Sequence, residues 1–265
     1  MLVVLVFGGC SLLRSRGEAV KFPEGQYMKR EAVVDGTKYG YRVFVPPTAS
    51  RDHKLPVMLF LHGSDDRGKD NELQIRGLNE FLTRGPQNFP FIVVMPQCEK
   101  GKFWDNEMIQ QAIASLDQSV REFNGDESHL YLAGFSLGGY GAWHIVTMYP
   151  HKFAAVVPMS GRVLPRPGER KLLAPEVAAL VDSAHPYEAI AERLRDTPIW
   201  IFHGGADPIV PVNTSREMVN ALRKVGNQQV NYTEYEGLGH YSIGTAFQEA
   251  RLFQWLAQQK LIEAQ

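Results

Sequence analysis

The chain has 265 residues, a length that suits one large α/β domain better than two small ones. Hydrophobic residues make up 44% of the chain and charged residues 22%, so a sizeable core can be buried. The formal net charge is -1, and the 28 basic and 29 acidic side chains are mixed along the chain, which argues against a nucleic acid or another polyanion as a partner.

The N-terminal region differs in composition from the rest. Residues 1–7 are apolar and Cys10 follows two glycines, which resembles the end of a bacterial lipoprotein signal, although Phe7 stands where an aliphatic residue is usual and no Lys or Arg precedes the run. The segment is too short to span a bilayer. We therefore expect a cell-envelope or secreted protein, tethered to a membrane only through lipidated Cys10, with a cytoplasmic location as the alternative. Residues 11–26 form a predicted linker.

From residue 27 onward the chain alternates apolar runs with amphipathic stretches. Two β-rich runs, residues 27–34 and 38–45, flank Asp35-Gly36, which is a strong hairpin signal. Further predicted strands cover residues 57–61, 91–95, 129–133, 153–158, 198–202 and 230–235, and predicted helices cover residues 71–84, 107–123, 140–149, 213–225 and 242–258. This rhythm predicts a single domain over residues 27–265 with a mostly parallel sheet and helices on both faces.

One segment breaks the rhythm. Residues 160–196 contain four prolines and mixed polar content, so we expect an insertion that overhangs the functional site as a partial cap.

The segment 132–142, LAGFSLGGYGA, carries the pattern G-x-S-x-G with Ser136 at its centre. It joins a predicted buried strand to a predicted helix, and a serine on such a sharp turn has its hydroxyl exposed. Nearby glycines relieve the crowding of the turn, and the helix directs free backbone N–H groups to the place where negative charge develops. The pattern predicts the nucleophile elbow of a serine hydrolase. The competing interpretation is a glycine-rich turn that holds an ordinary serine.

A serine nucleophile needs a base and an orienting acid, which follow in the order Ser, Asp or Glu, His on this architecture. Asp207 and His240 satisfy that order, and each follows a predicted strand directly. Asp182 and Asp196 are weaker candidates for the acid, because one lies in the insertion and the other precedes a strand. The remaining histidines are assigned to the surface, a helix, the insertion or loop packing: His53, His129, His151, His144, His185, His62 and His203.

An oxyanion intermediate needs backbone donors. The N–H of Leu137, directly after the nucleophile, is the first candidate. The second is the N–H of Ser64 in the loop after the strand 57–61, with that of Asp65 as the weaker alternative.

Several segments together resemble the α/β-hydrolase superfamily, and within it the bacterial esterases called predicted peptidases, which are related to phospholipase/carboxylesterase, feruloyl esterase and polyhydroxybutyrate depolymerase-like enzymes. The resemblance covers about residues 27–260. It implies Ser136, Asp207 and His240 as a catalytic triad and Ser64 and Leu137 as oxyanion donors. The segments are His62-Gly63-Ser64, Arg67-Gly68, Asp70-Asn71, Pro96-Gln97-Cys98, Trp104-Asp105, the Ser136 motif, His203-Gly204, Asp207 and Gly239-His240.

The same resemblance implies Trp104 and Gln97 as substrate-binding residues, with Trp104 near the mouth of the pocket. A tryptophan that covers the edge of the core is the alternative for Trp104. Arg67, with Asp70 or Glu72, is expected to pin the oxyanion loop. No cluster of His, Cys and carboxylates has metal-ligand spacing and no dinucleotide or P-loop pattern occurs, so we expect neither a metal nor a cofactor.

The sequence therefore predicts a serine carboxylic-ester hydrolase that acts on short-chain or aromatic esters of the feruloyl or acetyl type, on small molecules or polysaccharides. A serine peptidase of the same fold is one alternative. A non-catalytic binding protein is another, although such a protein usually lacks a triad member and all three are present here. A dienelactone hydrolase would more often use a cysteine as nucleophile.

Overall fold

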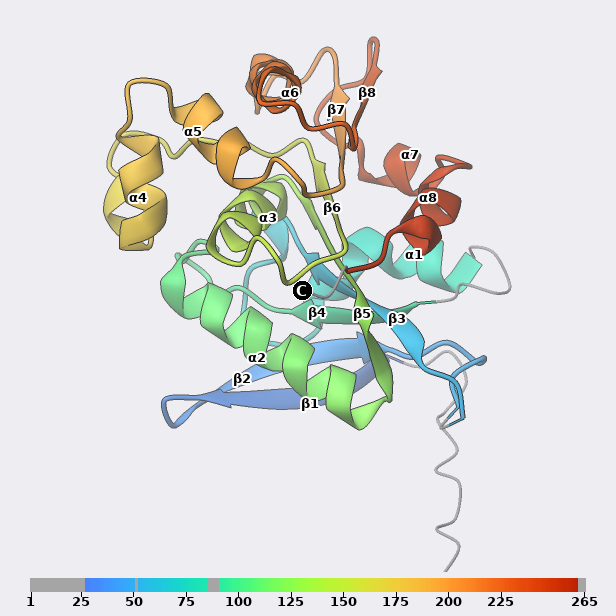
Figure 1. Cartoon of the computed structure of the whole chain (residues 1–265). Helices are drawn as coiled ribbons and strands as arrows, with labels where there is room; N and C mark the ends of the chain where they lie inside the picture. Colours follow the sequence, from blue (N-terminus) through green and yellow to red (C-terminus); the bar gives the residue numbers. More distant parts are fainter. Residues whose placement is uncertain (1–26, 51, 85–90, 262–265) are drawn as a thin grey trace, which may run out of the picture.

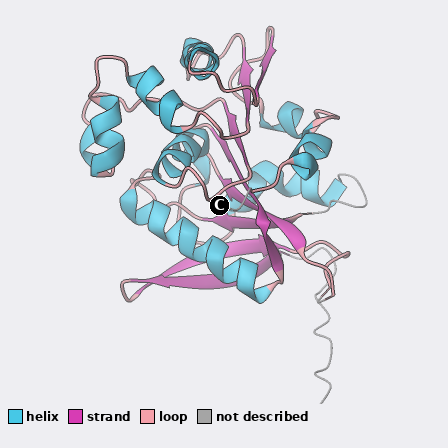
Figure 2. Cartoon of the chain, viewed as in Figure 1, coloured by secondary structure: helices cyan, strands magenta, loops and turns pink. Residues whose placement is uncertain are grey.

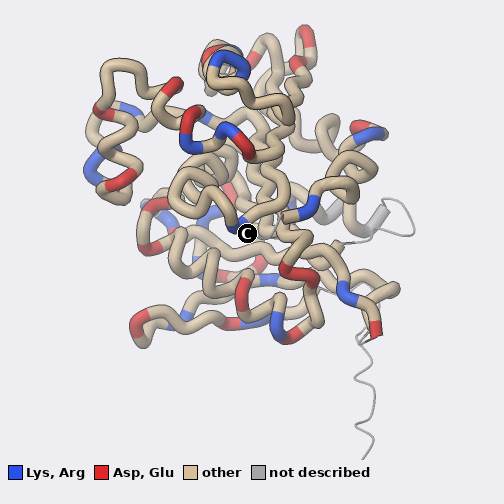
Figure 3. The backbone as a smooth tube through the Cα atoms, viewed as in Figure 1, with Lys and Arg blue, Asp and Glu red and all other residues tan. Residues whose placement is uncertain are grey.

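The computed structural model describes residues 27–50, 52–84 and 91–261. The N-terminal segment, with the predicted lipidation at Cys10, lies outside the described residues. Within those ranges, no helix is both long and apolar enough to cross a membrane. Residues of both charge signs are spread over the whole described domain (Figure 3).

An eight-stranded sheet runs through the centre of the domain (Figures 1 and 2). The strand order is β1-β2-β4-β3-β5-β6-β7-β8. β2 is antiparallel to both of its neighbours, β1 and β4, and every neighbouring pair from β4 across the sheet to β8 is parallel. The predicted mostly parallel sheet is confirmed. The strands are β1 (Tyr27–Val34), β2 (Thr37–Phe44), β3 (Leu55–Leu61), β4 (Ile92–Pro96), β5 (Gly125–Phe135), β6 (Ala155–Met159), β7 (Ile199–Gly204) and β8 (Val230–Tyr235).

Helices cover both faces of the sheet (Figure 1). One face packs against α2, α3, α5 and α6, and the other against α1, α7 and α8. The helices are α1 (Arg76–Arg84), α2 (Asn106–Glu122), α3 (Leu137–Met148), α4 (Pro175–Val181), α5 (Pro186–Arg193), α6 (Asn213–Lys224), α7 (Ile243–Phe247) and α8 (Leu252–Gln258). Short 3-10 turns cover residues 64–66, 73–75 and 170–172.

The central strand β3 is apolar throughout because both of its faces are buried. Val57, Leu59 and Leu61 belong to the core cluster on one face of the sheet, and Met58 and Phe60 belong to the cluster on the other. Successive side chains of a strand point to opposite faces, so a strand that is covered on both sides has no polar positions.

The hairpin between β1 and β2 forms where the sequence predicts it. Asp35 and Gly36 both have positive φ angles, 47° and 78°, and Val34 pairs with Thr37 across the turn. A two-residue loop with left-handed backbone at both positions matches the twist of the flanking strands, which explains the preference for Asp-Gly here.

The predicted C-terminal helix over residues 242–258 is divided into α7 and α8. Phe247 and Leu252 are both fully packed into the core, with 2% and 0% of their surface exposed. In one straight helix, residues five apart lie about 140° from each other around the axis, so they could not both face the sheet. The break between the helices allows both side chains to be buried.

Candidate active site

Ser136 occupies the sharp turn between β5 and α3. Its backbone has φ 55° and ψ -113°, a conformation that is unfavourable for a residue with a side chain. The Ser136 N–H donates to the carbonyl of Met159 on the neighbouring strand, at 2.9 Å. The sheet therefore holds the turn in place, as the predicted nucleophile elbow requires.

Two glycines make room for this turn. A Cβ on Gly134 would lie 2.2 Å from the carbonyl oxygen of Gly138, and a Cβ on Gly138 would lie 1.9 Å from the carbonyl oxygen of Leu61. Both distances are far below van der Waals contact. A side chain at either position would force the helix away from the sheet and displace Ser136.

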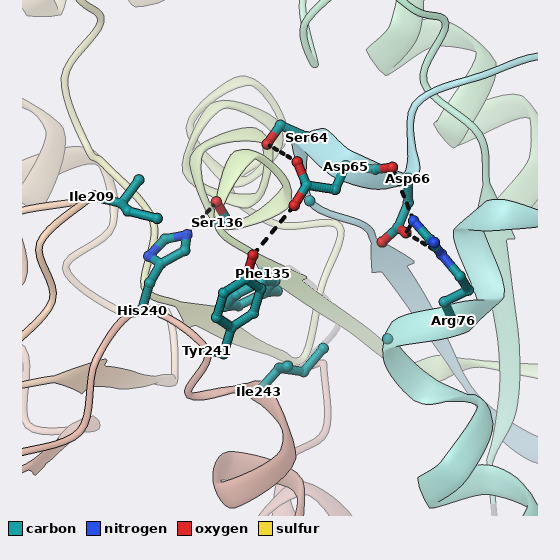
Figure 4. Close-up of a pocket in the computed structure, with 12 residues that line it drawn as sticks. Ser64, Asp65, Asp66, Arg76, Phe135, Ser136, Ile209, His240, Tyr241 and Ile243 are labelled. Atoms are coloured by element: carbon teal, nitrogen blue, oxygen red, sulfur yellow. Dashed lines mark hydrogen bonds and ion pairs between the residues drawn. The ribbon is translucent and has the colours of Figure 1, made fainter.

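The structure brings Ser136, His240 and Asp207 together. His240 Nε2 lies 2.7 Å from Ser136 Oγ, and His240 Nδ1 lies 2.7 Å from Asp207 Oδ2 (Figure 4 shows the first pair). The carboxylate can only accept, so Nδ1 carries the proton and Nε2 is left as the acceptor for the serine hydroxyl. The Asp207 side chain is fully buried, and that of His240 is 6% exposed.

The Asp207 carboxylate receives hydrogen bonds from several sides. The backbone N–H groups of Ile209 and Val210 donate to Oδ1 at 2.8 and 2.9 Å. Burial raises the pKa of Asp207, but the hydrogen bonds from His240 and from these N–H groups outweigh burial and bring the pKa below its ordinary value. The group therefore stays ionised behind the imidazole at neutral pH.

A second histidine also contacts this carboxylate. His203 Nε2 lies 3.2 Å from Asp207 Oδ2 and 3.0 Å from the carbonyl oxygen of Val210. Its Nδ1 lies 2.7 Å from Ser215 Oγ. The oxygens of Val210 and Asp207 can only accept, so the proton is on Nε2 and Nδ1 accepts from the serine hydroxyl. Burial lowers the pKa of His203 and keeps it neutral. The sequence predicts only loop packing for His203, and its spacing of four residues from Asp207 is the one signal of this contact.

The loop that carries His240 is tied to the neighbouring part of the sheet by two buried serines. The Ser242 N–H donates to the carbonyl of His240 at 2.8 Å, and Ser242 Oγ lies 2.7 Å from Ser160 Oγ. Both hydroxyls are at most 1% exposed. The sequence gives no signal of this pair, because the two residues are 82 positions apart.

His62 and His144 are unsuited to act as the base. Burial lowers the pKa of each to about 4. His62 Nδ1 donates to the carbonyl of Gly63 at 2.7 Å, and its Nε2 accepts from the N–H of Cys98 at 2.9 Å. Both ring nitrogens of His62 are thus used by the backbone, as the predicted loop-packing role requires.

Both predicted oxyanion donors lie beside the nucleophile. Leu137 is the first residue of α3, and the first N–H groups of a helix have no acceptor within the helix. On the other side, a Cβ built on Gly63 would lie 3.6 Å from Ser136 Cβ, and Ser64 lines the same pocket as Ser136. The loop after β3 therefore approaches the serine closely, and the roles of Ser64 and Leu137 stay predictions.

Trp104 and Gln97 lie behind the site and do not line its pocket. Trp104 has no exposed surface, and its Nε1 donates to the carbonyl of His62 at 3.2 Å. Gln97 is 4% exposed, accepts from the N–H of Asn71 at 2.8 Å and donates to the carbonyl of Asp66 at 3.1 Å. Both side chains support the oxyanion loop, so the expected direct contact with substrate is not what the structure shows.

Arg67 supports the same loop with partners other than those expected. Its Nε donates to the carbonyl of Ser64 at 3.0 Å and its Nη1 to the carbonyl of Lys102 at 2.9 Å. Asp70 instead accepts from the N–H groups of Glu72 and Leu73. The guanidinium of Arg67 donates to backbone carbonyls. Such contacts cannot be predicted by looking for oppositely charged residues in the sequence.

A pocket of about 330 Å³ opens at Ser136 (Figure 4). Its walls come from the oxyanion loop, the start of α1, the elbow and the loops after β7 and β8. None of the residues 160–196 lines it, and instead α4 and α5 pack beside α3 and α6. The expected overhang of the insertion is therefore wrong. The lining residues are Gly63, Ser64, Asp65, Asp66, Arg76, Gly77, Phe135, Ser136, Ile209, His240, Tyr241 and Ile243.

A metal centre has no evident place in the site. Among the residues that the structure describes, no group of three or more His, Cys, Asp or Glu side chains could hold a metal ion. Burial raises the pKa of the Cys98 thiol to about 12, so this residue is not a reactive thiolate at neutral pH.

Comparison with known protein families identifies the family of this chain. The model of the prolyl oligopeptidase family matches residues 101–260, which include Ser136, Asp207 and His240. The chain belongs to the prolyl oligopeptidase family. Its esterase-like relatives and the strand order confirm the resemblance to esterase-like α/β-hydrolases.

Three relatives of this member of the prolyl oligopeptidase family are informative. A thermostable esterase of known structure is 29% identical, with a TM-score of 0.71 over 88% of this chain and 63% of that chain. An uncharacterised secreted protein of Arthroderma benhamiae is 25% identical over 84% of this chain and 26% of its own length. A bifunctional acetylxylan esterase/xylanase of Neocallimastix patriciarum is 34% identical over 40% of this chain and 16% of its own length. The chain thus spans about a quarter or less of these two curated relatives.

Proposed function

We propose that this protein is a serine carboxylic-ester hydrolase. The observation that carries the proposal is the pair of 2.7 Å contacts that link Ser136 to His240 and His240 to Asp207. When a hydroxyl, an imidazole and an ionised carboxylate are hydrogen-bonded in this order, they can generate a nucleophile at neutral pH.

In the proposed reaction, Ser136 Oγ attacks the ester carbonyl while its proton passes to His240 Nε2. The resulting oxyanion accepts hydrogen bonds from the backbone N–H groups of Ser64 and Leu137. His240 then gives the proton to the leaving alcohol as the C–O bond breaks. Water attacks the acyl-enzyme, His240 takes the proton of the water, and the proton returns to Ser136 as the acid product leaves. Asp207 holds the imidazole in position and stabilises its charged form.

Two kinds of evidence favour an ester as the substrate. The thermostable esterase and the acetylxylan esterase/xylanase are the relatives with the highest identities reported above. The pocket is also compact and opens directly beside the serine, which suits a small acyl or alcohol group. A short-chain, acetyl or feruloyl ester, free or linked to a polysaccharide, is the proposed substrate class.

A serine peptidase is the second candidate, and the name of the prolyl oligopeptidase family favours it. A substrate panel separates the two: p-nitrophenyl acetate, butyrate and octanoate, methyl ferulate, acetylated xylan and a peptide nitroanilide. We expect hydrolysis of esters and much slower or no hydrolysis of the nitroanilide. A preference for the nitroanilide would replace the esterase assignment with a peptidase one.

The nucleophile is tested with the same panel and Ser136→Ala. The variant should lose a factor of about 10⁴ or more in kcat on the best substrate, because no other hydroxyl can take the place of the attacking oxygen. Thr48→Ala, which removes a hydroxyl at an exposed position outside the pocket, serves as the control and should keep the rate of the unchanged protein. Wild-type activity in Ser136→Ala would refute the proposed mechanism.

A further inference from the structure

Three charged side chains line the pocket at Ser136, and two of them neutralise each other. Arg76 Nη2 lies 2.8 Å from Asp66 Oδ1, and Arg76 Nε donates to the same oxygen at 3.0 Å. The Asp66 carboxylate is only 15% exposed. Figure 4 shows Asp66 turned toward Arg76 and away from Ser136. This pair adds little net charge to the pocket.

The third charge, on Asp65, has no such partner. Its side-chain contacts are two long hydrogen bonds from hydroxyl groups, Ser64 Oγ at 3.4 Å and Tyr241 Oη at 3.3 Å. Among the side chains that the structure describes, no Lys, Arg or His forms an ion pair with Asp65. The Arg76 guanidinium reaches only the Asp65 backbone carbonyl, at 3.1 Å. In Figure 4 the Asp65 carboxylate lies between Ser64 and Tyr241, and Asp65 and Ser136 line the same pocket.

The rest of the pocket does not compensate this charge. Phe135, Ile209, Tyr241 and Ile243 give apolar or uncharged surface. Tyr241 and Ile209 are 67% and 52% exposed, so they border the open mouth, and the Tyr241 hydroxyl is the group that spans from the His240 loop to Asp65. One uncompensated negative charge therefore faces any group that enters beside the nucleophile.

We propose that Asp65 sets the charge preference of the pocket: it favours esters that are neutral or positively charged near the scissile bond and disfavours esters that carry a carboxylate there. The inference rests on the proposed ester hydrolase function. In a pocket of about 330 Å³, every bound atom lies within roughly one Debye length of the carboxylate, so screening by salt is incomplete. A substrate anion must also exchange its hydration for a site that holds a like charge, which costs binding in both ground state and transition state.

Three aryl acetates that differ only in the para substituent provide the test: 4-carbamoylphenyl acetate, 4-carboxyphenyl acetate and 4-(trimethylammonio)phenyl acetate. The value of kcat/KM is divided by the rate constant for hydroxide hydrolysis of the same ester, which removes the difference in leaving-group reactivity. At low salt we expect the neutral ester to exceed the anionic one by about tenfold and the cationic ester to equal or exceed the neutral one. The neutral-to-anionic ratio should fall toward one as salt is raised to about 0.5 M.

Matched variants assign the effect to one carboxylate. Asp65→Asn should bring the neutral-to-anionic ratio close to one, and Asp65→Glu, which keeps the charge, should retain most of the preference. Asp52→Asn removes a charge from an exposed position outside the pocket and should leave the ratio of the wild type unchanged.

The outcomes separate this inference from the proposed function. Equal normalised rates for all three esters in the wild type, or a ratio in Asp65→Asn equal to that of the wild type, would overturn the role of Asp65 while leaving the esterase intact. A wild-type protein that hydrolyses none of the acetates and none of the esters in the panel would overturn the esterase assignment itself.

Discussion

The loops after β3 and β8 each carry a buried histidine next to a glycine, and the two histidines behave differently. His62 is 1% exposed and His240 is 6% exposed. Both nitrogens of His62 are occupied by the backbone, at Gly63 and Cys98. The nitrogens of His240 instead face a carboxylate and a serine hydroxyl.

This comparison shows that burial at the end of a strand does not make a histidine a base. Burial is the main cause that lowers the pKa of His62 to about 4, so the ring stays neutral at neutral pH while both of its nitrogens are hydrogen-bonded. The Nε2 atom of His240 can accept the proton of the Ser136 hydroxyl. The ionised Asp207 carboxylate at Nδ1 can then stabilise the charged ring. The hydrogen-bond partners of the two ring nitrogens therefore determine whether a buried histidine can act as a base.

The largest expected effect comes from exchanging these two histidines for glutamine. His240→Gln should lower kcat by a factor of about 10⁴, because the amide cannot take the serine proton. His62→Gln should act mainly on folding, with a loss of about 2 kcal/mol in the free energy of unfolding from the buried bonds it weakens. Ester hydrolysis by folded protein and urea unfolding would be measured for both. A loss of kcat in His62→Gln as large as that in His240→Gln would break the distinction between them.

The next effect concerns acid stability. His62 and His144 have folded pKa values of about 4, below the ordinary value near 6.5, so the unfolded chain binds their protons first as the pH falls. Their contribution is therefore fully present above about pH 6.5 and is lost progressively down to about pH 4. Between pH 7.5 and pH 5, each should remove about 2 kcal/mol from the free energy of unfolding.

Urea unfolding at the two pH values checks this expectation. The variant His144→Gln should show a pH dependence smaller by about 2 kcal/mol than that of the unchanged protein. The surface residue His53 is the matched control, and His53→Gln should leave the difference between the two pH values as it is. An unchanged pH dependence in His144→Gln would mean that His144 does not resist protonation in the fold.

The smallest expected effect is at His203, which contacts the same oxygen of Asp207, Oδ2, as His240 does. His203→Leu removes the Nε2–H group 3.2 Å from the carboxylate and should lower kcat by about tenfold with little change in KM, because Asp207 loses one of the donors that fix its orientation. His203→Gln, whose amide can still donate, should recover most of the rate. Equal losses in both variants would assign His203 to packing alone.

Much of the fold follows from local sequence. The Asp35-Gly36 turn has the backbone that its residues favour, and the apolar run in β3 reflects burial on both faces. The positions of Ser136, Asp207 and His240 could be predicted because each lies directly after a strand of one parallel sheet, where the strand ends meet.

Other features depend on contacts that the sequence does not display. From the sequence alone, Trp104 could face either the substrate or the core. Its Nε1 donates to the carbonyl of His62, 42 positions away, and this hydrogen bond holds the ring in the core. The division of the last helix depends on which side chains the sheet can accept. The insertion has a recognisable composition, but its docking beside α3 and α6 depends on tertiary packing.

The hydrogen bond between Tyr241 and Asp65 joins residues 176 positions apart and closes one side of the pocket. The pocket is therefore incomplete in any shorter part of the chain, because its walls come from loops that follow β3, β5, β7 and β8 and from the starts of α1 and α7. Long-range pairing of this kind is slow to form and has a high entropic cost before any contact is made. In a refolding experiment, hydrolysis would return only after the loop that follows β8 has docked on the loop that follows β3, which makes activity a reporter of complete folding.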